Sequence, residues 1–160
     1  MYHRILVPVD GSPTSNAGLA EAVRLAQRLG ARIRLLHVVD ELPIAVSAEG
    51  LGGMSIDLLG LLREAGEQVL AQARSRVEAA GVPVDVVLVD SLSGRLADHV
   101  TAQAQAWPAD LIVIGTHGRR GIGRMLLGSD AEHVLRHAPV PALLFRAPAA
   151  DAGPDPLAAA

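Results

Sequence analysis

Five short apolar runs alternate along this chain with segments of helical periodicity. The apolar runs predict strands at residues 4–10, 32–40, 82–90, 109–115 and 140–146. Apolar residues three and four positions apart predict helices at residues 15–30, 57–80, 93–107 and 130–137. The second, third and fourth runs lack in–out alternation, which is typical of parallel strands buried on both faces. We therefore expect a single-domain α/β fold, an open parallel five-stranded sheet with helices on both faces.

The expected domain spans residues 1–147 and has an aliphatic core, because only Tyr2, Trp107 and Phe145 are aromatic. Residues 148–160 are rich in Ala and Pro and low in bulky side chains, so we expect this tail to be disordered. Residues 41–56 contain three glycines and no clear period, which predicts a mobile loop.

The composition excludes several mechanisms. The chain has no cysteine, so it has neither a disulfide framework nor thiol chemistry. All fourteen basic residues are arginines, which removes a lysine Schiff base and the lysine of the common phosphate-binding loop. The net charge of −3 argues against non-specific binding of nucleic acid. The first apolar run is too short for a signal peptide and no window is long enough for a membrane helix, so we expect a cytoplasmic protein.

A glycine-rich stretch follows the fourth predicted strand, with the pattern Gly115-x2-Gly118-x9-Gly128-Ser129. The carboxyl end of a parallel strand is where ligands bind in such sheets, and the amino end of a helix attracts anions. Ser129 and Glu132 have the spacing of a capping box, which predicts Ser129 as the N-cap of the last helix. The intervening loop carries three arginines that could neutralise phosphate charge: Arg119, Arg120 and Arg124. The alternative is that the glycines serve the turn, Ser129 only caps, and the arginines are solvated.

Familiar phosphate motifs do not account for this stretch. Gly123 and Gly128 have the spacing of a phosphate loop, but Ser-Asp follows them in place of Lys-Ser/Thr. Gly121 and Gly123 lack the third glycine of a dinucleotide motif. Neither a conventional NTPase nor a dinucleotide oxidoreductase is supported.

The pattern resembles the ATP-binding motif of the universal stress protein family, G-x2-G-x9-G-Ser/Thr. Four other stretches agree with this family: "ILVPVDGS", "LLHVVD", "ADLIVIGTHGR" and "HAPVPALLF". The resemblance covers about residues 2–146. It implies a Rossmann-like fold of the adenine-nucleotide alpha-hydrolase type, and ATP with Mg²⁺ as ligands.

The resemblance implies a set of ligand contacts in this chain. At the adenosine end it implies Pro8, Val9, Asp10 and Val38, with Asp10 near the ribose or a bound metal. Against ribose and phosphates it implies Ile114, Gly115, Gly118 and Arg119, and at the phosphates Gly128, Ser129 and the amide of Asp130. His117 lies between the motif glycines, where we expect a loop or phosphate contact in preference to a catalytic base.

Asp130 departs from the family pattern, which has a small, apolar or threonine residue at this position. A carboxylate there stabilises the helix start, but it either repels a triphosphate or helps to hold Mg²⁺. The choice between ATP and ADP or AMP therefore stays open. The resemblance also implies a homodimer in which the last strand, from Val140 to Phe145, pairs with its copy.

Three functions remain open after these observations. The first is an ATP-binding stress-response protein that acts through nucleotide occupancy. The second is a slow ATP hydrolase, for which Asp10, Asp130 and His117 are the candidate bases. The third is a partner-binding module whose pocket is empty or holds AMP. Among the other histidines, His133 and His137 share a helix face but lack a third metal ligand, and His37 is expected in the core.

Overall fold

The computed structural model describes residues 1–40, 55–91, 94–116 and 128–146. The elements follow the chain in the order β1 (Arg4–Pro8), α1 (Pro13–Leu29), β2 (Arg32–Asp40), α3 (Ser55–Ala79), β3 (Val84–Ser91), α4 (Leu96–Ala106), β4 (Leu111–Gly115), α5 (Ser129–His137) and β5 (Ala142–Phe145). The predicted loop 41–56 ends two residues early, because α3 begins at Ser55. Residues 41–54 of that loop and the predicted disordered tail lie outside the described residues.

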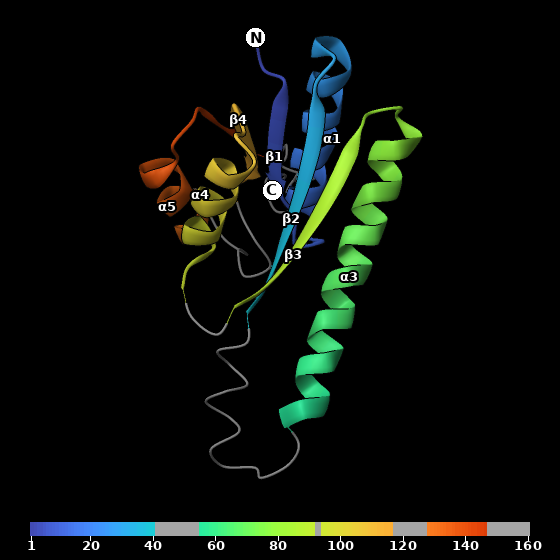
Figure 1. The fold of residues 1–160 in the computed structure, drawn as a ribbon, viewed down its shortest axis with the longest axis vertical. Coiled ribbons are helices and arrows are strands. Elements are labelled where there is room, and N and C mark those ends of the chain that lie inside the picture. The colour runs from blue at the N-terminus through green and yellow to red at the C-terminus, as the bar shows by residue number, and fades with distance from the viewer. Residues whose placement is uncertain (41–54, 92–93, 117–127, 147–160) are drawn as a thin grey trace, which may run out of the picture.

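All five strands form one parallel sheet in the order β3-β2-β1-β4-β5. The predicted open parallel five-stranded sheet is therefore confirmed. The chain adds β2 and β3 on one side of β1, and then β4 and β5 on its other side (Figure 1). The strand order thus reverses between β1 and β4, which is the place where ligands bind in open α/β sheets.

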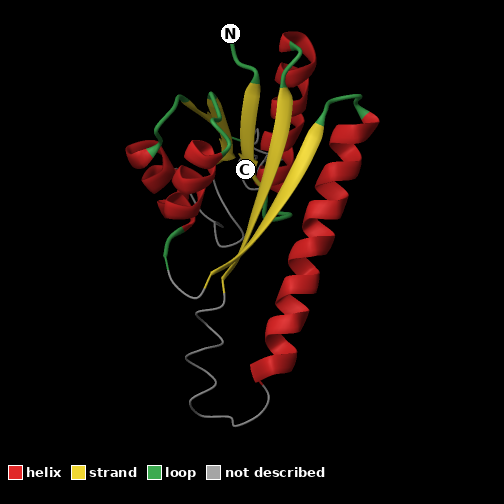
Figure 2. Ribbon diagram, in the orientation of Figure 1, coloured by secondary structure: helices red, strands yellow, loops and turns green. Residues whose placement is uncertain are grey.

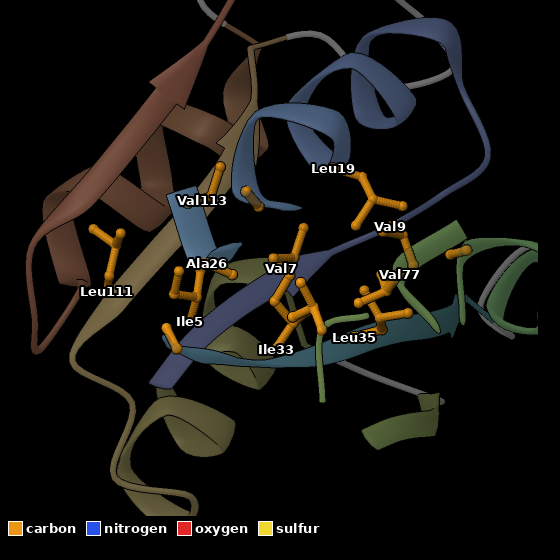
Figure 3. Packing of buried hydrophobic residues seen from close by; sticks show 14 of the residues in the cluster. Ile5, Val7, Val9, Leu19, Ala26, Ile33, Leu35, Val77, Leu111 and Val113 are labelled. Carbon is orange, nitrogen blue, oxygen red and sulfur yellow. The ribbon is translucent and has the colours of Figure 1, made fainter. Parts of the chain in front are cut away.

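Helices cover both faces of the sheet, α1 and α3 on one face and α4 and α5 on the other (Figure 2). The core beneath α1 and α3 consists of aliphatic side chains such as Val7, Leu19, Leu35 and Val77 (Figure 3). The core beneath α4 and α5 contains Leu6, Leu36, Val100, Ile112 and Val134. The expected aliphatic core is confirmed on both faces. None of the helices in the described part of the chain has both the length and the apolar character that a membrane crossing requires.

The prediction that the third strand is buried on both faces is wrong. β3 lies at the edge of the sheet, and most of its side chains are half-buried or exposed. Its two aspartates form ion pairs with neighbouring elements, Asp85 with Arg34 and Asp90 with Arg63. Charged side chains on an edge strand oppose pairing with other chains, which explains why an apolar run tolerates this position.

The amino end of β1 is fastened to the start of β4 by one carboxylate. Asp110 accepts the amide hydrogens of His3 and Arg4, at N–O distances of 2.8 and 3.0 Å. The Arg4 Nε donates to the carbonyl of Pro108 at 2.6 Å. These bonds set β1 and β4 side by side, and so bring their carboxyl ends together at the other edge of the sheet.

Candidate functional site

Residues 9–12, Val-Asp-Gly-Ser, leave β1 at the carboxyl edge, and we call them the VDGS turn. The Val9 amide donates to the Leu36 carbonyl at 2.8 Å, so the chain stays beside β2 for one residue past the end of β1. The Ser12 amide then donates to Asp10 Oδ1 at 2.9 Å, and the Asp10 amide to Ser15 Oγ at 3.2 Å. The Asp10 carboxylate therefore shapes the turn, whatever else it binds.

Helix α1 begins directly from this turn. Ser12 is its N-cap and accepts the Ser15 amide at 3.2 Å, and Pro13 occupies the first turn, where proline is favoured. The predicted start at residue 15 was two residues late, although the Ser-Pro pair was a readable signal. The Asn16 side chain donates to the Gly11 carbonyl at 3.1 Å, which joins α1 to the turn a second time.

Gly115, the first glycine of the motif, lies against the first turn of α1. A Cβ atom at Gly115 would be only 2.9 Å from the Thr14 carbonyl oxygen, closer than real Cβ contacts. A Cβ at Gly18 would lie 3.4 Å from the Gly115 amide nitrogen. The helix and the end of β4 therefore meet backbone to backbone. Packing against α1 is therefore sufficient reason for a glycine at position 115, and the same contact places the VDGS turn beside the start of the motif.

The prediction of Ser129 as an N-cap in a capping box with Glu132 is wrong. Gly128 is the N-cap of α5, Ser129 is the first helical residue, and no side chain among the described residues caps this end. Glu132 instead forms an ion pair with Arg136 at 3.0 Å. The helix begins one residue earlier than predicted, because the Glu132 amide donates to the Gly128 carbonyl at 3.0 Å. The Gly128 amide in turn donates to the Thr116 carbonyl at 2.8 Å, which joins the helix start to the end of β4.

The position of the α5 start changes which groups face the carboxyl edge of the sheet. The Gly128 amide is already bonded, whereas the amides of Ser129, Asp130 and Ala131 have no partner within the helix. The side chains of Ser129 and Asp130 are exposed. The helix start can thus offer backbone amides, one hydroxyl and one carboxylate to a ligand.

The remaining predicted site residues fall into three groups: strand residues near the carboxyl edge, one core residue, and residues outside the described part of the chain. Pro8 is buried at the end of β1, level with Leu36 of β2, and Val38 is half-buried two residues farther along β2. Ile114 packs into the core beneath α4 and α5, so only its backbone reaches the edge. Three predicted contacts lie outside the described residues: His117, Gly118 and Arg119.

Two histidines at this edge have structural partners that the sequence did not reveal. His37 is buried, as expected, and its Nδ1 donates to the Val9 carbonyl at 2.6 Å. His99 Nε2 lies 2.8 Å from Ser91 Oγ, which joins α4 to the end of β3. No local sequence motif predicts either pair. The partners become neighbours only because β2 lies beside β1 and α4 packs near the end of β3.

The predicted pair of helical histidines does not form a metal site among the residues that the structure describes, where no cluster of three or more candidate ligands occurs. The His133 and His137 rings are stacked with centroids 6.2 Å apart. The Arg95 guanidinium lies 2.8 Å from His133 Nε2. A fixed positive charge beside an imidazole opposes the binding of a cation there.

The chain is similar to proteins of one family over nearly its whole length. The profile of the universal stress protein family matches residues 1–146. A universal stress protein of Methanocaldococcus jannaschii is 35% identical over 92% of this chain and 84% of that protein. A solved family member from Burkholderia pseudomallei is 34% identical, with a TM-score of 0.74, over 91% of this chain and 97% of that one. The solved hypothetical protein MJ0577 is 26% identical, with a TM-score of 0.81, over 93% and 99% of the two chains.

Two more distant structures contain adenine nucleotides. A universal stress protein of Archaeoglobus fulgidus in complex with dAMP is 21% identical, with a TM-score of 0.63 over 90% of this chain and 98% of that one. A family protein of Arabidopsis thaliana with bound AMP is 17% identical, with a TM-score of 0.68 over 96% and 97% of the chains. At these identities the likeness shows the fold.

The contact at Gly115 leads to a stability prediction that does not depend on any ligand. Gly115→Ala should lower the free energy of unfolding by about 1–3 kcal/mol, because the new methyl group overlaps the Thr14 carbonyl. Urea denaturation of the nucleotide-free protein measures this loss. Gly60→Ala is the control, since a Cβ at Gly60 meets nothing within 4 Å. Equal stability of Gly115→Ala and the wild type would mean that α1 and β4 are not in close contact.

Proposed function

Since this chain belongs to the universal stress protein family, we propose that it binds an adenine nucleotide between the carboxyl ends of β1 and β4. One observation carries this proposal. The VDGS turn and the Gly128–Ser129 start of α5 reach the same edge of the sheet, one on each side of the strand-order reversal. Relatives of the same fold that hold dAMP and AMP support it. We further propose that ATP is the ligand and that the protein acts through occupancy of this site.

The phosphate end of the proposed site is the start of α5. The first-turn amides and the positive end of the helix dipole favour phosphate oxygens, and the Ser129 hydroxyl adds a donor. We propose that Gly118, His117 and Arg119 approach the phosphates from the motif loop. Gly128 is the N-cap of α5, and we propose that the absence of a side chain there also lets the phosphates approach the backbone.

The adenosine end of the proposed site is formed by β1 and β2. Pro8 and Val9 would line it, and the backbone of Val38 would contact the adenine. Asp10 would face the ribose hydroxyls or Mg²⁺, although one of its oxygens already accepts the Ser12 amide. Because hydrogen bonds hold the turn before any ligand binds, little order remains to be imposed on this side.

Asp130 decides which nucleotide this site favours. Its carboxylate is exposed on the first turn of α5, beside the amides proposed to bind phosphate. Mg²⁺ is commonly held by one or two carboxylates together with substrate phosphates, so Asp130 can favour a Mg²⁺–ATP complex. Without the cation, the same carboxylate repels a triphosphate and favours AMP.

The first experiment identifies the molecule that the purified protein carries. We expect ATP at about one per chain, released by denaturation and identified by chromatography with mass detection. AMP or ADP in its place would mean that Asp130 or hydrolysis has changed the site, and turnover assays would separate the two. Absence of every nucleotide, with no rise of the melting temperature on adding ATP, ADP or AMP, would contradict the proposed function.

The second experiment tests the phosphate end. Gly128→Val should abolish nucleotide binding while the protein stays folded, because φ −58° and ψ 143° at Gly128 are open to any residue, whereas the new side chain would stand at the proposed phosphate site. With ATP at 100 times its Kd, the wild type should gain about 2.7 kcal/mol of stability and the variant none. Gly60→Val on the open surface of α3 should behave as the wild type. Normal binding by Gly128→Val would place the phosphates elsewhere.

We also propose a homodimer formed through β5. This strand ends the sheet, and Leu143 within it is 39% exposed. An apolar edge strand left bare invites pairing with another chain. Pro139 and Pro141 precede the strand and limit such pairing, so the two features oppose one another.

The two edges of the sheet allow a matched test of this dimer. Leu143→Arg on β5 should convert the dimer into a monomer, because it buries a charge in the proposed interface. Val86→Arg on β3, where the native side chain is 38% exposed, should leave the dimer intact. Light scattering after size-exclusion chromatography measures both masses. A dimer lost with Val86→Arg alone would move the interface to β3.

A further inference from the structure

We propose that His37 is a positioning residue for the nucleotide, because its Nδ1–H bond to the Val9 carbonyl holds the VDGS turn. The inference rests on the proposed function and deepens it. His37 is not itself proposed to touch the ligand. It acts through the turn, which is the adenosine side of the proposed site.

The hydrogen bond between His37 and Val9 is short and buried. Nδ1 lies 2.6 Å from the Val9 carbonyl oxygen, and the histidine is 8% exposed. A carbonyl only accepts, so Nδ1 carries the hydrogen. Leu36, the residue before His37, accepts the Val9 amide at 2.8 Å. Both polar groups of Val9 are therefore held by adjacent residues of β2, which leaves the turn little freedom at its first residue.

Helix α3 holds the histidine ring in place. The ring lies against Gly66, where a Cβ would be 2.8 Å from His37 Cδ2 and 3.1 Å from Nε2. Leu88 of β3 closes the same space, with its Cδ1 atom 3.0 Å from that Cβ position. The absent side chain at Gly66 is thus what makes room for the imidazole. Without that room, the ring would lose its place beside Val9.

The same helix also contacts the turn directly. Gly11 has φ +77°, and a Cβ there would lie 3.2 Å from a methyl carbon of Val69. Gly66 and Val69 are three residues apart and face the same side of α3. The helix therefore supports the turn at two points, through the His37 ring and through Val69. Movement of α3 would change the shape of the proposed adenosine side.

The first test removes the hydrogen bond and then restores it. His37→Phe keeps a ring against Gly66 but has no donor, so the turn should populate its binding conformation less often. If that population falls to a tenth, the affinity for ATP falls about tenfold. His37→Asn should recover most of the affinity, because its Nδ2 is bonded to Cγ as Nδ1 is in histidine. Isothermal titration calorimetry with ATP, and in parallel with AMP, measures each protein.

Two controls separate positioning from general loss of stability. Val77→Ala removes buried volume from α3 eight residues, or about 12 Å, beyond Val69, so it lowers stability while the contacts at Gly66 and Val69 are kept. It should bind as the wild type does. Gly66→Ala and Gly60→Ala both raise the helix propensity of α3, but only the former displaces the His37 ring. We expect about tenfold weaker binding for Gly66→Ala and no change for Gly60→Ala.

The outcomes distinguish the two proposals. A wild-type protein that binds neither ATP nor AMP overturns the proposed function, and this inference with it. Wild-type binding with unchanged affinity in His37→Phe overturns only the positioning role. A loss in His37→Asn alone would assign the effect to the ring volume, which His37→Phe keeps, and would reject the hydrogen bond. Weak binding by His37→Phe and Gly66→Ala, with recovery by His37→Asn, supports the role of His37.

Discussion

The backbone contact between α1 and β4 is the constraint on which the rest of the site depends. The Thr14 carbonyl and Gly115 approach so closely that no side chain fits between them, and Gly18 faces the same strand end one helical turn later. This contact brings the first strand and the glycine motif together, although they are about a hundred residues apart in sequence. The VDGS turn is then placed by its covalent link to α1, and the motif begins beside it.

The two sides of the proposed site are built in different ways. Hydrogen bonds from α1 and β2 hold the VDGS turn, and α3 packs against it. The other side relies on the start of α5, whose first-turn amides need a partner from outside the helix. A prearranged turn reduces the ordering cost of binding adenosine, while the helix start provides attraction for phosphate.

Glycine has a different physical role at each of three positions near the proposed site. Gly115 allows a helix to touch a strand, Gly66 makes room for a buried imidazole, and Gly128 caps a helix next to the proposed phosphates. Gly11 of the VDGS turn differs from these three because it takes a positive φ of +77°. The spacing of the motif does not reveal why each position needs a glycine. Packing against α1 explains Gly115, and helix capping together with the proposed ligand contact explains Gly128.

The sequence by itself determined the order of the elements, the parallel sheet, the aliphatic core and the family, because periodicity and motif spacing are local properties of the chain. It also located the carboxyl edge of the sheet and most of the candidate residues. It did not determine that β3 lies at an edge, that Gly128 caps α5 in place of Ser129, or that His37 bonds Val9. Those features depend on which strands become neighbours and on bonds such as that of Gly128 to Thr116, and only the tertiary structure brings these groups together.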